Sequence, residues 1–154
     1  MEKIKVDGLK GLNVDTLIGY VFKLWVKSKR QILNELNLTG PQFDVLSAIY
    51  YLSLNRKGVI QINISEETEI DPMTVSIILR NLEKSNLIIR IRGTVNTRVK
   101  YVELTDEGAS LFKKASLKMS RHCNELYGNI DEKNLTSQLI MLSNELNKID
   151  KLNN

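Results

Sequence analysis

Apolar side chains recur at helical spacing along most of the chain, which predicts a fold built from long helices. The first predicted helix runs from Val14 to about Leu36 and carries two neighbouring apolar stripes: Leu17, Val21 and Leu24 in one, Ile18, Phe22 and Trp25 in the other. A helix that is apolar on two sides has to be covered on two sides, so it is either central or buried by a partner subunit. A second helix is predicted from Pro41 to about Leu54, because proline suits a first helical turn.

The middle of the chain predicts a strand and two further helices. The segment Val59–Ile64 alternates β-branched and polar residues, which is typical of one short strand. Ser65 is predicted to cap a short helix over Glu66–Glu69, whose acidic residues suit a helix N-terminus. Asp71 is a good N-cap for a helix over Pro72–Ser85, since proline fits the first helical position.

The last third of the chain predicts a hairpin followed by two helices. Asn86 suits the left-handed position that follows a helix end, and two strands are predicted at Leu87–Ile91 and Val99–Leu104. Two helices then start near Thr105 and Asp131. In the last one, apolar residues repeat at spacings of four and three, a seam that pairs helices as in a coiled coil: Leu135, Leu139, Leu142, Leu146 and Ile149.

This order of elements predicts a mainly α fold with a small β-hairpin (α+β), organised as a winged helix–turn–helix. We expect a single domain over residues 1–154. Its DNA-binding region is residues 38–108, and long dimerisation helices lie in 1–37 and 109–154. The predicted dimer contacts are Leu17 and Val21 in the first helix, together with the five residues of the C-terminal seam. In such a motif the second helix presents its N-terminal part to the major groove, and the hairpin reaches the neighbouring backbone or minor groove.

Several short motifs occur in a fixed order between Pro72 and Gly108: Pro72-Met-Thr-Val-Ser76, Leu82-Glu-Lys-Ser-Asn-Leu-Ile88, Arg90, Asn96-Thr-Arg98 and Leu104-Thr-Asp-Glu-Gly108. Together they resemble the MarR family of bacterial transcription regulators, with the likeness extending over most of the chain. The resemblance implies a homodimer held by its terminal helices, with two winged regions on a pseudo-palindromic operator, acting as a repressor. It also implies control by a small phenolic or lipophilic ligand, or by cysteine oxidation.

Three positions depart from the family pattern. The wing usually carries Asp-x-Arg, whereas this chain has Asn96-Thr97-Arg98. The position after Ser76 is often arginine in the family and is Ile77 here, and Asn86 replaces a glycine. The operator sequence of a relative therefore cannot be transferred to this chain.

The placement of charge supports a polyanionic partner. Residues 72–104 contain six basic and two acidic residues, so this segment has a net charge of +4. The formal net charge of the whole chain is also +4. A local basic surface attracts double-stranded DNA even where the rest of the chain is balanced. The acidic run Glu66, Glu67, Glu69 and Asp71 would instead repel phosphates. It leaves open the alternative of a winged-helix module for protein–protein contact without specific DNA binding.

The predicted DNA contacts lie on the helix over 72–85 and on the hairpin. On the helix they are Pro72, Met73, Thr74, Ser76, Ile77, Arg80 and Asn81, and on the hairpin Arg92, Arg98 and Lys100. Thr74 and Ser76 can donate to phosphates or base edges. Ile77 either meets a thymine methyl group in the groove or simply extends the apolar core side of its helix.

Other chemistry is sparse. Tyr20, Trp25, Tyr50 and Tyr51 are candidates for an effector pocket, although aromatic residues at this spacing also suit a core. Cys123 has no second cysteine to pair with, and the only histidine, His122, points about 100° away from it on a helix. The sequence lacks metal-ligand spacing, a phosphate-binding glycine loop and an apolar run long enough to span a membrane. We therefore expect a cytoplasmic protein that is not an enzyme and needs no metal or cofactor.

Overall fold

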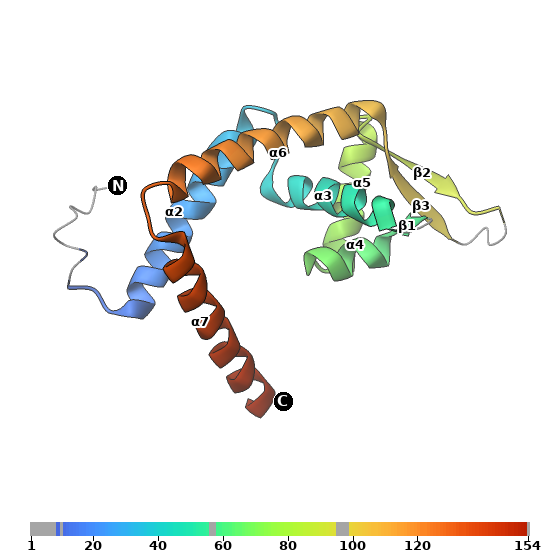
Figure 1. Cartoon of the computed structure of the whole chain (residues 1–154). Helices are drawn as coiled ribbons and strands as arrows, with labels where there is room; N and C mark the ends of the chain where they lie inside the picture. Colours follow the sequence, from blue (N-terminus) through green and yellow to red (C-terminus); the bar gives the residue numbers. More distant parts are fainter. Residues whose placement is uncertain (1–8, 10, 56–57, 95–98, 154) are drawn as a thin grey trace. The chain divides into compact units, whose positions relative to one another are not determined.

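The computed structural model describes residues 9, 11–55, 58–94 and 99–153 (Figure 1). The chain divides into two compact units, residues 1–116 and 117–154, and the boundary falls inside the helix over residues 106–127. The first unit starts with the helices α2 (Val14–Asn34) and α3 (Gly40–Asn55). These are followed by β1 (Val59–Ile60), α4 (Gln61–Thr68), α5 (Pro72–Lys84), β2 (Ile88–Arg92) and β3 (Lys100–Leu104). Helix α6 (Asp106–Tyr127) begins in this unit, and α7 (Glu132–Asn153) belongs to the second.

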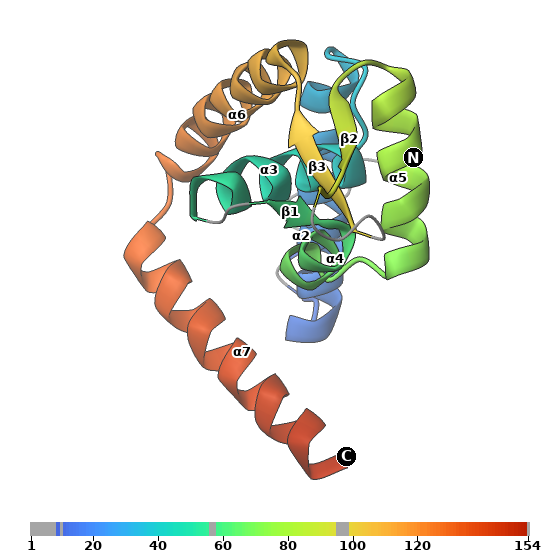
Figure 2. The ribbon, with the colours of Figure 1, turned by 90° about the vertical axis from the view of Figure 1, so that its right-hand side faces the viewer.

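The sheet is small and antiparallel. Its strand order is β1-β3-β2, so the predicted hairpin of β2 and β3 gains a third, two-residue strand. Val59 and Arg90 both pair with Val102, one from each side. Helix α3 contacts β3 and α5 contacts β2, and Figure 2 shows α5 along an outer side of this unit. The prediction of a mainly helical winged fold with a small hairpin is confirmed.

The core of the first unit joins all of its helices to the sheet. Its fully buried side chains come from every element from α2 to β3: Leu33, Leu46, Ile49, Val59, Ile64, Leu79, Leu82, Ile88 and Val102. The predicted inner side of α5 is buried as expected, including Val75 and Ile78. Phe112, at the start of α6, packs its ring against Phe43 and Tyr50 of α3 at centroid distances of 5.7 and 4.9 Å. This packing fixes the start of α6 on the winged motif.

The predicted strand over Val59–Ile64 is wrong beyond Ile60, because residues 61–68 form α4. The Asn63 side chain accepts a hydrogen bond from the Ile60 backbone N–H, which starts the helix, and Ile64 is completely buried. Burial of one helical face thus outweighs the β-branched composition. Ser65 is not a cap either. It lies inside α4, and its hydroxyl donates to the Ile70 carbonyl oxygen across the turn.

The boundaries of α5 follow the predicted local chemistry. Asp71 Oδ1 accepts hydrogen bonds from the backbone N–H groups of Met73 and Thr74 at 3.0 and 2.9 Å. Asn86, just beyond the helix, has φ of 55°, the left-handed conformation that asparagine tolerates better than most residues. The helix is therefore fixed in place at both ends by residues next to it in sequence.

Candidate nucleic-acid interface

Helix α5 presents a continuous uncovered face to its surroundings. Met73 is 76% exposed and Ile77 is 49% exposed, whereas the neighbouring Ile78 is 7% exposed. Ile77 therefore does not extend the buried side of the helix within this chain. The other predicted contact residues on α5 are exposed, apart from the half-buried Ser76: Pro72, Thr74, Arg80 and Asn81.

The start of α5 is held by the predicted Asp71 cap and by one contact that the sequence did not predict. The Gln61 side-chain amide donates to the Pro72 carbonyl oxygen at 2.8 Å, which ties the start of α4 to the start of α5. A hydrogen bond from the Thr74 side chain, together with the backbone N–H groups of Thr74 and Met73, holds the pKa of the Asp71 carboxyl below its ordinary value.

The hairpin carries exposed cations at its outer end. Arg92 and Lys100 are cross-strand partners, and both are exposed. The Gly93 backbone N–H donates to the Val99 carbonyl oxygen at 2.9 Å and continues the ladder beyond them. Arg98, also predicted to contact DNA, lies outside the described residues. The geometry brings two of the three predicted hairpin contacts to one end of the sheet.

One basic residue of this region is already paired. The Arg90 guanidinium on β2 donates from both Nε and Nη2 to Glu83 Oε2 on α5, with an Nε–Oε2 distance of 3.0 Å. The hydrogen bond from Arg90 lowers the pKa of the Glu83 carboxyl, and the same bond raises the pKa of Arg90. The pair joins the hairpin to α5. Both residues belong to the motifs between Leu82 and Arg90, but the sequence did not predict the ion pair between them.

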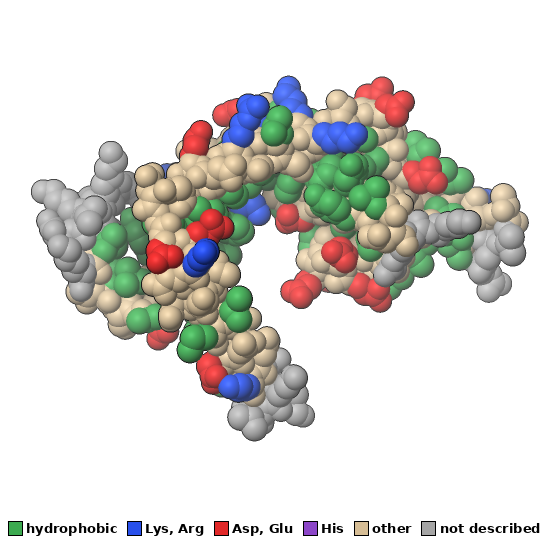
Figure 3. Space-filling view, viewed as in Figure 1, with side chains coloured by type: hydrophobic (Ala, Val, Ile, Leu, Met, Phe, Trp, Pro, Cys, Tyr) green, Lys and Arg blue, Asp and Glu red, His purple; other side chains and the backbone are tan. Residues whose placement is uncertain are grey.

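Charges of both signs flank α5. Arg80 and Lys84 are exposed in its second half, and Arg80 Nε donates to the Ser76 carbonyl oxygen at 3.3 Å. Figure 3 shows acidic side chains gathered over α4 and the turn that follows it, where Glu66, Glu67 and Glu69 are exposed. The exposed basic side chains of this region therefore lie on the hairpin and in the second half of α5, away from the turn before Pro72.

Helices α2 and α7 each expose apolar side chains to an extent unusual for single-chain helices. On α2, Val21 is 59% exposed and Leu17 is half-buried. All five residues of the predicted seam on α7 are exposed: Leu135, Leu139, Leu142, Leu146 and Ile149. Exposed apolar stripes of this kind are typical of surfaces that bind another protein.

The four aromatic candidates for an effector pocket do not form one group of ring contacts. Trp25 packs against Phe22 with ring centroids 6.4 Å apart and lies under Lys29 Nζ, at 4.4 Å. Tyr50 and Tyr51 instead pack on Phe112. Tyr20 is half-buried on α2. The effector pocket over these residues stays a prediction.

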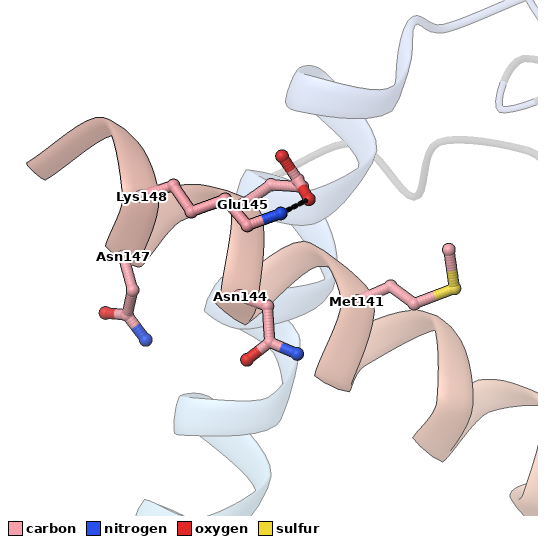
Figure 4. A pocket seen from close by; sticks show the side chains of 5 residues that line it. All are labelled: Met141, Asn144, Glu145, Asn147 and Lys148. Atoms are coloured by element: carbon pink, nitrogen blue, oxygen red, sulfur yellow. Dashed lines mark hydrogen bonds and ion pairs between the residues drawn. The ribbon is translucent and has the colours of Figure 1, made fainter. Parts of the chain in front are cut away.

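Two surface recesses are open rather than enclosed. One lies beside Tyr51 and is also lined by Asp44, Ser47 and Glu67. The other runs along α7, where the five labelled side chains in Figure 4 all come from that helix and Lys148 Nζ contacts Glu145 Oε1 at 2.6 Å. A recess with walls from a single helix does not enclose a small molecule.

The described residues offer little for catalysis. Within them, no three histidine, cysteine or acidic side chains come together to hold a metal ion. Cys123 is a free, half-buried thiol, and His122 Nε2 is buried without a hydrogen-bond partner among the described residues. In the part of the chain that the structure covers, no helix is both long and apolar enough to cross a membrane.

Comparison with known proteins agrees with the fold. The MgrA transcriptional regulator of Staphylococcus aureus, an HTH-type protein, is 34% identical over 82 residues. These make up 53% of this chain and 52% of MgrA, so the match spans about half the length of that relative. The S. aureus MepR–DNA complex superposes with a TM-score of 0.75 at 23% identity, covering 89% of this chain and 96% of MepR. Wild-type E. coli MarR gives a TM-score of 0.67 at 19% identity, covering 88% and 98%.

The similarity to solved structures shows the fold, and the match to a sequence family shows the family membership. The family described as "Transcriptional regulator SarA/Rot" matches residues 27–115, which is more than half of the chain and includes all of α3, α4, α5 and the hairpin. The resemblance to MarR-type regulators is confirmed by the same comparisons. The chain belongs to the SarA/Rot family of transcriptional regulators, which share the MarR-type winged helix.

Proposed function

We propose that this protein is a homodimeric repressor in the bacterial cytoplasm that binds a pseudo-palindromic operator in double-stranded DNA. The observation that carries the proposal is the uncovered, firmly capped outer face of α5 beside the exposed cations of the hairpin. A helix of this kind fits the major groove, which is about 12 Å wide. The MarR-type fold and the family of transcriptional regulators support the same conclusion.

In the proposed complex, α5 reads bases and the hairpin holds the backbone. The first turns of α5 enter the major groove, where Ser76 and Asn81 reach base edges or phosphates. Arg92 and Lys100 lie at the outer end of the sheet and bind phosphates. Arg90 does not take part, because Glu83 occupies its guanidinium group.

The dimer is built from the exposed apolar stripes of α2 and α7. Two winged units then face two half-sites, and the two-fold axis of the protein coincides with that of the operator. Both stripes lose their exposure in the dimer, which removes a large apolar surface from water. The residues 1–37 and 109–154 remain the proposed dimerisation regions.

A salt titration tests DNA binding. If the dimer neutralises about 6–10 phosphates, affinity for a duplex should fall by about 10³–10⁵ between 50 and 200 mM salt. The double variant Arg92→Ala with Lys100→Ala should weaken specific and random duplexes by similar factors, and should lower the salt slope by about one unit for each phosphate that is no longer neutralised. Ser53→Ala, an exposed residue on α3, is the matched control and should leave the slope unchanged.

The alternative is a winged helix that contacts another protein. The exposed Glu66, Glu67 and Glu69 favour it, because they repel phosphates near the start of α5. This alternative predicts no duplex binding at low salt, or binding that does not depend on salt. Either result would rule out the proposed function.

A further inference from the structure

Two apolar side chains on the outer face of α5 are largely uncovered in the described chain. Met73 is 76% exposed and Ile77 is 49% exposed. They are four residues apart on the helix, so they lie one above the other with Cβ atoms about 5–6 Å apart. They form a small apolar ridge on the face that the proposed function turns toward DNA.

The hydrogen-bonding side chains around this ridge are partly engaged within the helix. Among them, Arg80 donates from Nε to the Ser76 carbonyl oxygen at 3.3 Å. The ridge itself can recognise only an apolar group. In the major groove the one apolar group that a base pair presents is the C5-methyl group of thymine.

We propose that Met73 and Ile77 read thymine methyl groups, so that each operator half-site carries two thymines under the first turns of α5. This inference rests on the proposed function and specifies the DNA that it recognises. Successive bases of one strand rise by about 3.4 Å, so the two side chains reach thymines in neighbouring or next-neighbouring base pairs.

The two side chains should differ in how strictly they read. Ile77 is β-branched and is held in one main rotamer on a helix, so its methyl groups have a fixed position. Met73 has three rotatable bonds and a polarisable sulfur, which lets it adapt to a displaced methyl group. Ile77 is therefore the stricter of the two readers.

Replacement of single thymines by uracil tests the proposal, because uracil lacks the methyl group and keeps the O4 acceptor. The probe is the highest-affinity duplex selected from a random library with the full-length wild-type protein. At two thymines per half-site, uracil should weaken binding about fourfold, which corresponds to about 0.8 kcal/mol for one methyl group removed from water. At other thymines uracil should change little.

Variants then assign each methyl group to its reader. With Ile77→Ala, the uracil penalty should disappear at one of the two positions and persist at the other. With Met73→Ala the pattern should reverse. The matched control is Ile89→Ala, because Ile89 is an isoleucine with 45% exposure on β2, outside the proposed interface. It should keep both penalties.

Each other result overturns the inference in a distinct way. Specific binding that is insensitive to uracil at every position refutes thymine reading and leaves the proposed function standing. Failure to select any duplex refutes the proposed function and the inference with it. If Ile77→Ala weakens thymine and uracil duplexes equally, Ile77 does not read a methyl group.

The variant Ile77→Val keeps the branched shape of the side chain and controls for misfolding of Ile77→Ala. It should show a partial uracil penalty at the same thymine.

Discussion

Gly108, in the first turn of α6, is the position where one added methyl group should destabilise the fold most clearly. A Cβ atom placed there would lie 1.9 Å from the Leu87 carbonyl oxygen and 2.8 Å from its carbonyl carbon. Ordinary contact begins near 3.4 Å, so α6 or the chain before β2 would have to move by roughly 1.5 Å. The obstacle is backbone and cannot be relieved by a side-chain rotation.

The movement breaks hydrogen bonds that join the two segments. The Thr105 backbone N–H donates to the Leu87 carbonyl oxygen at 3.1 Å, and the Thr105 hydroxyl donates to the Asn86 carbonyl oxygen at 2.7 Å. The same hydroxyl accepts from the Gly108 N–H at 3.0 Å. Loss of two or three such bonds costs about 2–3 kcal/mol, and the higher helix propensity of alanine offsets about 1 kcal/mol. Gly108→Ala should therefore lower the free energy of unfolding by about 1–2 kcal/mol.

Gly19 provides the matched control, because it lies inside α2 with no atom within 4 Å of an added Cβ. Gly19→Ala should raise the free energy of unfolding by up to about 1 kcal/mol. Urea unfolding followed by circular dichroism measures both variants, at one fixed protein concentration because a dimer's stability depends on concentration. If Gly108→Ala is as stable as the wild type, the close approach to Leu87 does not exist.

Two further predictions concern the dimer and the ion pair. Replacing Leu142 and Leu146 together by Asp should give a monomer or an unfolded chain in sedimentation analysis, whereas Asn144→Asp with Asn147→Asp adds the same charge off the stripe and should leave the dimer intact. A DNA-binding monomer from the leucine variant would contradict the architecture. Glu83→Gln should lower the free energy of unfolding at pH 7 by about 0.2–1 kcal/mol. Because the fold lowers the pKa of Glu83 below its ordinary value of 4.5, this difference should vanish as the pH falls further below 4.5, and a constant difference would refute the ionic contribution.

The sequence predicted most accurately those features of the fold that depend on residues close together in the chain. The start and end of α5 depend on Asp71, Pro72 and Asn86, all within two residues of a helix end, and each behaves as its side chain dictates. Helix α4 was mispredicted because its stability comes from the burial of Ile64 in the core, to which distant elements contribute. Local β propensity is weak compared with such tertiary burial.

The sequence also predicted an interface, but it did not predict the state of the charges there. The count of basic residues over 72–104 is correct, yet it does not show that Arg90 is bound by Glu83 and holds the hairpin against α5. The change of charge along α5 also depends on the fold. The acidic turn precedes the helix, and the exposed cations Arg80 and Lys84 lie in its second half. In the proposed complex, we therefore expect the hairpin and the end of α5 to bind phosphates. On that division, the apolar side chains in the first turns of α5 are the proposed base readers. Truncating one of them should weaken binding to the cognate duplex without changing the salt slope.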